Sequence, residues 1–332
     1  MIVSNYFLKR LFFIVLTAEY MVAGYSQDLE LSQFYAAPLY LAPSYAGTAD
    51  GMRLAANYRD QWPQITNAFL TYMFSVDYNF SDYNSGVGVM VARDQKGELG
   101  YNTTNLGFYY SYDIFIEHKV HIRPGLQYIY SLNGIDLSKL RMRDQIINNT
   151  ASSNNIPVFE NYNFSDAAFS VLAYTNDYFL GSKIDHLLQP AQSQGDVENI
   201  PLKFDLFGGA KFGFRGNHMK QKSESLMFAF NFMTTAKFSQ LELGTMAVVK
   251  AFQLGLWYRG IPVMKTNPGS DGLILSMGYT YRNIVFGFSH DFTISGLRND
   301  SNGANEASLI ILLDQVGHGK KKPGAIKCPE FH

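Results

Sequence analysis

The feature that most constrains this chain is a pair of long runs, residues 273–281 and 284–294, with alternating apolar side chains. The apolar positions are Leu273, Leu275, Met277, Tyr279, Tyr281, Ile284, Phe286, Phe288, Phe292 and Ile294. Because successive side chains of a strand point to opposite faces, this period predicts β-strands, and only Arg282 and Asn283 separate them, as in a tight hairpin. A soluble sandwich would alternate over shorter strands, whereas a membrane-crossing strand needs about ten residues. We therefore predict a hairpin of an outer-membrane β-barrel.

The same alternation recurs along the chain and predicts an all-β fold, a transmembrane antiparallel β-barrel of about fourteen strands. The predicted strands cover residues 52–60, 68–80, 86–94, 102–115, 118–131, 164–174, 178–184, 204–215, 226–232, 238–249, 251–260, 273–281, 284–294 and 307–313. An even strand number places both ends of the barrel on the periplasmic side, so the loops after odd-numbered strands, including residues 132–162, are predicted to be external. The last strand is apolar on both parities, which leaves its facing open.

The parity of each run predicts which side chains face lipid. The predicted apolar belt includes Leu70, Tyr72, Phe74, Leu254, Leu256, Leu275, Met277, Phe286 and Phe288. The polar residues predicted to face the lumen are Asp77, Asp113, Asp205, Lys211, Arg215, Arg259 and Asp291. Since an unpaired buried charge is costly, we expect these groups to pair with one another or with a plug segment. A pathway for a solute is the alternative use of such a lumen.

The chain divides into four predicted parts. Residues 1–26 are predicted to be a signal peptide, because Lys9 and Arg10 precede an apolar stretch and small residues precede a cut after Ser26. Residues 27–50 lack a clear period and form a lead-in segment, which we expect at the periplasmic mouth of the barrel or inside its lumen. Residues 51–316 are the barrel, and residues 317–332 are a basic periplasmic tail. The predicted location is the outer membrane, which the chain crosses many times.

No constellation of residues points to catalysis, a metal or a cofactor. Ser289 and His290 are the only adjacent Ser/His pair, and neighbours on a strand face opposite ways, so they cannot act together. The single cysteine, Cys328, has no partner for a disulfide. A net charge of −1 gives no support for a nucleic-acid partner. We therefore predict that the protein is not an enzyme, with no catalytic, metal-binding or cofactor-binding residues.

Several short motifs occur in a fixed order along residues 27–332. They are LSQFYAAPLYLAPSYAG at 31–47, YRDQWP at 58–63, GVG at 86–88, FSD at 164–166, the stretch from His186 to Pro190, and AIKCPEF at 325–331. In this order they resemble the PorP/SprF family of Bacteroidetes outer-membrane proteins, which is linked to the type IX secretion system, and its SprF-like members in particular. Ala37 and Ala42 stand where asparagine is usual in that family, so side-chain hydrogen bonds from those two positions are not expected here.

The resemblance implies a barrel that helps to export or retain a particular cell-surface protein, which for SprF-like members is a large adhesin of gliding motility. The implied partners are outer-membrane lipid, the secreted surface protein and periplasmic components of type IX secretion. The predicted partner-binding residues are Gln33, Tyr45, Arg59, Trp62, Lys320, Lys321, Lys322 and Phe331. Of these, Arg59 and Trp62 are expected at an outer rim of the barrel, where a tryptophan commonly anchors at the interface.

The tail carries three adjacent lysines, then Pro323-Gly324, and ends near the aromatic Phe331. Charges can steer an encounter while a buried aromatic holds the contact, so we predict that the tail docks a periplasmic component. The alternatives are a solvated end, or lysines that only meet lipid headgroups. For the whole chain, the alternative function is an outer-membrane channel or transporter for a small solute.

Overall fold

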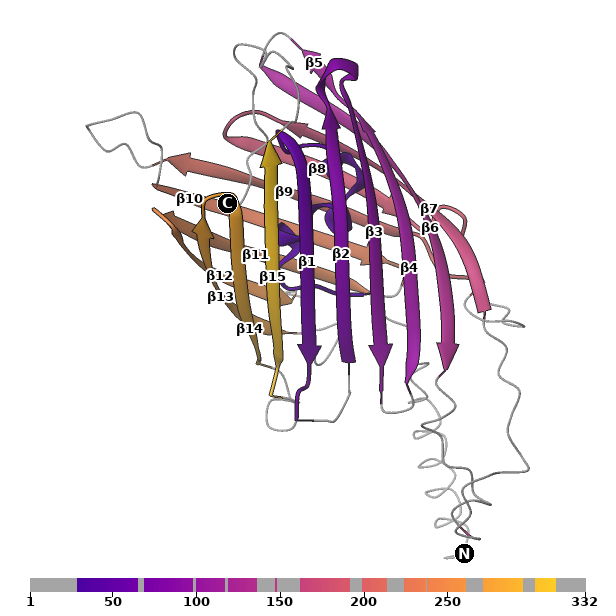
Figure 1. Ribbon diagram of the computed structural model, residues 1–332. Helices are drawn as coiled ribbons and strands as arrows, with labels where there is room; N and C mark the ends of the chain where they lie inside the picture. Colours follow the sequence, from indigo (N-terminus) through magenta and orange to yellow (C-terminus); the bar gives the residue numbers. More distant parts are fainter. Residues whose placement is uncertain are drawn as a thin grey trace, which may run out of the picture. The chain divides into compact units, whose positions relative to one another are not determined.

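The computed structural model describes residues 29–64, 69–97, 100–116, 119–135, 147, 162–191, 199–213, 224–236, 238–260, 271–294 and 302–314 (Figure 1). The described residues from Leu31 onward belong to one compact unit. The predicted signal peptide, the basic tail, Arg215 and most of the predicted external loop at 132–162 lie outside the described residues. Among the described residues, no helix combines the length and the apolarity that a membrane span requires.

The described residues contain fifteen strands, and each is antiparallel to its neighbours. They are β1 (Gly51–Gln61), β2 (Phe69–Phe80), β3 (Ser85–Lys96), β4 (Tyr101–Tyr112), β5 (Ile114–Ile116), β6 (Val120–Ile135), β7 (Tyr162–Tyr174), β8 (Tyr178–Asp185), β9 (Lys203–Gly213), β10 (Glu224–Thr235), β11 (Ser239–Val249), β12 (Phe252–Gly260), β13 (Gly272–Tyr281), β14 (Ile284–Thr293) and β15 (Ala304–Asp314). Neighbours in sequence pair with each other, except β4 and β5, which both pair with β6. The pairing of β1 with β15 and of β4 with β6 closes the ring. The short β5 continues β4 past Asp113 against the same neighbour, β6, so the barrel has the fourteen wall positions that the sequence predicts.

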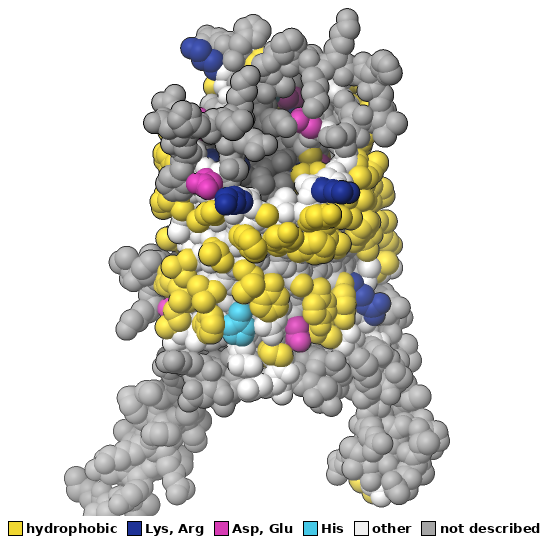
Figure 2. Space-filling model, turned by 60° about the vertical axis from the view of Figure 1, so that its left-hand side comes forward, with side chains coloured by type: hydrophobic (Ala, Val, Ile, Leu, Met, Phe, Trp, Pro, Cys, Tyr) yellow, Lys and Arg dark blue, Asp and Glu magenta, His cyan; other side chains and the backbone are white. Residues whose placement is uncertain are grey.

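The hairpin of β13 and β14 shows how the alternation builds the wall. Its strands are joined through Arg282 and Asn283, and Arg282 has a left-handed backbone with φ of 56°. Ile274 is 1% exposed and Leu275 is 47% exposed, so the two parities face the interior and the outside. The predicted belt residues are exposed apart from the half-buried Leu70. Figure 2 shows hydrophobic side chains in a belt across the visible face, with lysine and arginine side chains along the upper part of the belt and at its lower right.

The facing of β15, which the sequence leaves open, is set by its two neighbours. β15 pairs with β14 on one side and with β1 on the other. In this register Glu306, Ser308 and Ile310 turn inward and are buried, whereas Ala307 and Leu313 are exposed on the outside. The inward face of this mostly apolar strand therefore places the Glu306 carboxylate and the Ser308 hydroxyl in the lumen.

The two ends of the barrel differ in their connections. At one end the strands are joined by mostly short turns, such as Thr175–Asp177 between β7 and β8 and the two residues between β13 and β14. At the other end the connections include residues 136–161 between β6 and β7 and residues 261–271 between β12 and β13. We call these the turn end and the loop end of the barrel.

Residues 31–49 fold inside the ring of strands, which is one of the two placements that the sequence allows for the lead-in segment. They form three short helical turns, η1 (Phe34–Ala36), α2 (Pro38–Leu41) and η2 (Pro43–Tyr45). A proline begins α2 and η2, where a missing N–H leaves no hydrogen bond unmade. All of these residues are buried except Tyr40 and Thr48, which are half-buried. We call residues 31–49 the plug.

Candidate functional site

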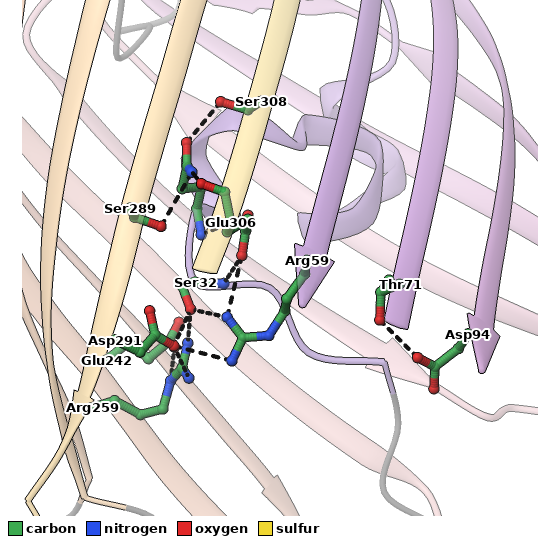
Figure 3. A network of polar contacts seen from close by, with 11 residues as sticks. Ser32, Arg59, Thr71, Asp94, Glu242, Arg259, Ser289, Asp291, Glu306 and Ser308 are labelled. Carbon is green, nitrogen blue, oxygen red and sulfur yellow. Dashed lines mark hydrogen bonds and ion pairs between the residues drawn. The ribbon is translucent and has the colours of Figure 1, made fainter. Parts of the chain in front are cut away.

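The plug is held at the loop end by the backbone of Ser32 and Gln33. The N–H groups of Ser32 and Gln33 donate to the two carboxylate oxygens of Glu306, at 2.7 and 3.1 Å. The hydroxyl of Ser32 donates to Asp291 Oδ2 at 2.5 Å (Figure 3). Glu306 belongs to β15 and Asp291 to β14, so two wall strands hold the beginning of the plug.

The side chain of Gln33 is hydrogen-bonded at both of its polar ends. Its Nε2 donates to the carbonyl of Glu306 at 2.9 Å and to Ser289 Oγ at 3.2 Å, and its Oε1 accepts from Ser308 Oγ at 2.7 Å. A Cβ at Gly287 would lie 2.3 Å from Ser308 Oγ and 2.6 Å from Oε1, so a larger residue at that position of β14 would displace this hydrogen-bonded pair. Gln33 is therefore a structural part of the plug, fitted to β14 and β15.

Arg59 adds a cation to this end of the lumen. Its Nη2 lies 3.0 Å from Asp291 Oδ2 and its Nη1 lies 3.4 Å from Glu306 Oε2. Nη1 also contacts the Ser32 hydroxyl. The expectation that Arg59 sits at an outer rim is wrong: the residue is 3% exposed, because its parity on β1 turns it into the lumen.

A second arginine completes the charge cluster from the opposite side. Arg259 of β12 donates through Nη1 to Asp291 Oδ2 at 3.1 Å and through Nε to Glu242 Oε1 at 2.5 Å. Its Nη2 donates to Ser32 Oγ at 2.8 Å. The predicted pairing of lumen charges with one another and with a plug segment is thus confirmed for Arg259 and Asp291. We call Arg59, Glu242, Arg259, Asp291 and Glu306 the charge cluster.

The plug is held at the turn end by a buried ion pair. Arg53 Nε lies 2.9 Å from Asp77 Oδ1, and both side chains are buried. The backbone N–H of Gly47 donates to Asp77 Oδ2 at 2.8 Å, while Arg53 Nη2 donates to the carbonyl of Tyr45 at 3.0 Å. Because Ser32 is fixed at the loop end and Gly47 at the turn end, the plug crosses the lumen between the two.

Close backbone contacts fix the last part of the plug. The carbonyl of Ala46 accepts from Arg123 Nη2 and from Ser111 Oγ, each at 2.7 Å. A Cβ at Gly86 would lie 2.0 Å from this carbonyl oxygen, and a Cβ at Gly125 would lie 2.3 Å from the backbone nitrogen of Ser44. These wall glycines are required because plug backbone lies directly against them.

Aromatic packing fills the lumen between the two ends. Tyr35 stacks on Trp257 of β12 with ring centroids 5.1 Å apart, and Phe34 meets the same indole edge-on at 5.3 Å. Trp257 Nε1 donates to Ser276 Oγ at 3.3 Å, so the buried indole N–H has a partner. Tyr45 lies 5.8 Å from Phe207 on the other side of the core. The plug is thus a packed part of the barrel core.

The structure separates the residues predicted to bind a partner into three groups. Gln33, Tyr45 and Arg59 are buried and contact the chain's own barrel, so they present no surface to another protein. Trp62 lies just after β1 with φ of 61°, is half-buried, and packs edge-on against Phe69 at 5.0 Å. The tail residues Lys320, Lys321, Lys322 and Phe331 lie outside the described residues.

Several residues that hold the plug were not predicted as site residues from the sequence, among them Arg53, Arg123, Trp257 and Glu306. The sequence does mark Glu306 and Ser308, because these two polar residues are two positions apart at the start of an otherwise apolar strand and therefore share one face of it. Trp257 has no comparable signal, because an aromatic residue on either face of a barrel strand is common. Among the described residues, no group of three or more His, Cys, Asp or Glu side chains is arranged to hold a metal ion.

A closed antiparallel barrel with an apolar outer belt and a charged interior that holds a plug is an outer-membrane β-barrel. The chain belongs to the PorP/SprF family: the model of the type IX secretion system membrane protein PorP/SprF matches residues 23–311. Fold and family together place the protein in the outer membrane as a component associated with type IX secretion. A comparison with curated proteins found no match.

Solved structures with a similar arrangement of strands include two outer-membrane proteins of low sequence identity. The outer membrane protein Omp33 of Acinetobacter baumannii is 8% identical, with a TM-score of 0.47 over 80% of this chain and 100% of that chain. The CymD monoaromatic hydrocarbon channel is 10% identical, with a TM-score of 0.47 over 84% of this chain and 93% of that chain. These similarities concern the arrangement of strands alone.

Proposed function

We propose that this barrel acts in type IX secretion by protein contact, assisting the export or the surface attachment of a partner protein such as a large gliding adhesin. Membership of the PorP/SprF family supports the secretion role. The observation that carries the contact mechanism is the plug, whose residues occupy the lumen and are hydrogen-bonded to the wall at both ends. A filled lumen leaves the outer surfaces of the barrel as the places where it can act.

A channel or transporter for a small solute is the competing proposal. It requires the plug to leave or to rearrange, which breaks the hydrogen bonds of Ser32 and Gln33 and exposes the buried ion pair of Arg53 and Asp77. Stranding buried charges and donors in this way is unfavourable. We therefore favour contact over conduction. Our proposal includes no enzymatic step.

The proposed partners lie on both sides of the membrane. An exported surface protein is the proposed partner outside the cell, and a periplasmic component of the secretion system is the proposed partner of residues 317–332. Outer-membrane lipid surrounds the apolar belt, which supports the barrel without specifying its role.

The deciding experiment compares intact cells with and without the gene. Proteins on the surface are labelled with a membrane-impermeant biotin reagent and identified by mass spectrometry, and the deletion strain is complemented with the wild-type chain. We expect one or a few large surface proteins to disappear on deletion and to return on complementation. An unchanged surface in the deletion strain, together with steady conductance of the purified barrel in a planar bilayer, would favour the channel instead.

A further inference from the structure

Strand β7 is longer than the neighbour that covers one of its edges. On the β6 side, β7 is paired along its whole length, from Tyr162 opposite Asn133 to Tyr174 opposite His121. On the β8 side, the pairing extends only from Phe169 to Tyr174. Since β8 ends at Asp185, the first residues of β7 have an edge that no described strand covers. This edge lies at the loop end, where residues 136–161 join β6 to β7.

The uncovered edge carries backbone donors and acceptors. The N–H of Leu187 donates to the carbonyl of Ala167 at 3.0 Å, so residue 167 turns its backbone groups away from β6. These groups alternate along an antiparallel strand, and Asn163 and Ser165 therefore turn theirs in the same direction as Ala167. No described residue hydrogen-bonds to the backbone of Asn163 or Ser165 on that side.

Residues 162–165 lack the side chains that commonly protect an open edge. Natural sheets commonly guard an open edge with a lysine, a proline, a bulge or a covering element. Residues 162–165 read Tyr-Asn-Phe-Ser and include neither lysine nor proline. Unpaired backbone groups are not tolerated against lipid, and the outward side chains here are the polar Asn163 and Ser165, whereas Phe169 further along β7 belongs to the apolar surface. The edge therefore lies in water beyond the apolar belt.

A fixed turn after β8 lies beside the start of this edge. His186 has φ of 61°, and its Nδ1 lies 2.5 Å from Asp166 Oδ2. Asp166 Oδ1 accepts from the N–H of Ala167 at 2.7 Å and from that of Leu188 at 3.3 Å. A carboxylate thus takes the N–H of Ala167 that a neighbouring strand would otherwise bind. Leu187 and Leu188, which follow the turn, are 42% and 57% exposed.

We propose that residues 162–166 of β7 are a β-augmentation site, to which an extended segment of the exported partner protein adds as a strand. The N–H and C=O groups of Asn163 and Ser165, which no described residue binds on that side, would hold its backbone, and Leu187 and Leu188 would receive an apolar side chain. A polypeptide strand supplies alternating donors and acceptors at this spacing, which neither a lipid nor a small solute does. The identity of the partner rests on the proposed function, and the loop end, predicted to be external, fits a surface protein.

Proline substitutions test the edge without touching the wall. Asn163→Pro combined with Ser165→Pro removes the two N–H groups that face the open edge and leaves the pairing with β6 intact. The matched control, Asn163→Ala with Ser165→Ala, removes the same side chains and keeps both N–H groups. The readout is the surface amount of the protein that the deletion strain loses, measured by biotin labelling of intact cells. Folding of each variant is checked by its heat-dependent mobility in gels.

We expect the proline pair to lower display about tenfold, the effect of losing two backbone hydrogen bonds, and the alanine pair to leave it unchanged. A photo-crosslinking amino acid at position 163 is expected to capture that same surface protein. Normal display by a folded proline variant would overturn the proposal, as would crosslinks only to this chain's own loops or to a second copy. If the proline pair does not fold, Ser165→Pro alone and the crosslink decide. A deletion strain that loses no surface protein would instead refute the proposed function.

Discussion

The charge cluster gives the most direct test of how the plug is held. Replacing Arg59 by methionine keeps a long apolar stem on β1 but removes the cation that lies 3.0 Å from Asp291 and 3.4 Å from Glu306. Before the change, three carboxylates face two arginines, and after it they face Arg259 alone. We expect the plug to loosen at its Ser32 end, because Glu306 is left buried without its cation.

The structure sets the size of this effect. Removing one partner of a buried ion pair costs about 3–5 kcal/mol, and the value for Arg59→Met should lie near the lower limit, because the N–H groups of Ser32 and Gln33 still stabilise the Glu306 carboxylate. Adding Glu306→Gln removes the stranded charge but keeps only one acceptor for those two N–H groups. The double variant should therefore lose about 1–2 kcal/mol relative to the wild type.

Two measurements on the barrel in lipid vesicles follow the change. Urea titration gives the free energy of unfolding. Maleimide labelling of Ala36→Cys, in a Cys328→Ser background without the native thiol, reports exposure of the plug near its Ser32 end; Ala36 is buried and the substitution adds a single heavy atom. We expect faster labelling in Arg59→Met and partial protection in the double variant.

The reasoning would be refuted by a single variant as stable as the wild type, or by a double variant less stable than the single one. The first result would mean that the charge cluster does not hold the plug. The second would mean that the carboxylate of Glu306 matters for its hydrogen bonds and that its charge is tolerated without Arg59. If the variant is less stable to urea but its labelling rate is unchanged, then the loss of Arg59 destabilises the barrel without releasing the plug.

Three further predictions follow from the facing of the wall and from the chain ends. Phe286→Arg should cost about 2–4 kcal/mol near the middle of the membrane, while a cysteine at Phe286 should react with lipid-soluble reagents and one at the buried Val285 should not. Gly86→Ala should destabilise the barrel, since a Cβ there would lie 2.0 Å from a plug carbonyl, whereas Gly213→Ala, with its nearest atom at 4.0 Å, should be silent in the same urea titration. Deleting residues 319–332 should leave a normally inserted barrel that no longer displays its surface partner; unchanged display would show that the tail has no docking role.

Much of the wall can be read from local pattern. β13 and β14 were predicted to within a residue at each end, because side-chain alternation and a two-residue turn are properties of neighbouring residues. The belt facing of Phe286 and the inward facing of Asp291 follow from the same parity. The facing of β15 could not be read in this way, because both of its parities are apolar and its pairing with β1 and β14 decides between them.

The candidate site was predicted only in part. Gln33 and Tyr45 were chosen for a resemblance of motif, which cannot tell a residue that binds a partner from one that holds a plug. Arg59 was placed at a rim from its position near a strand end, whereas its parity turns it inward to Asp291. The polar parity of Asp291 and Arg259 predicted that they would need partners, but not which partners they would find.

By itself, the sequence determined the membrane class, the number of strands and the faces of most of them, since each depends on the order of neighbouring residues and on the thickness of a bilayer. Only the tertiary structure decided that the plug lies in the lumen, that Ser32 meets a carboxylate 274 residues away, and that β7 extends past the end of β8. These features depend on closing the ring of strands. Closure brings distant residues together at distances and directions that no local period encodes.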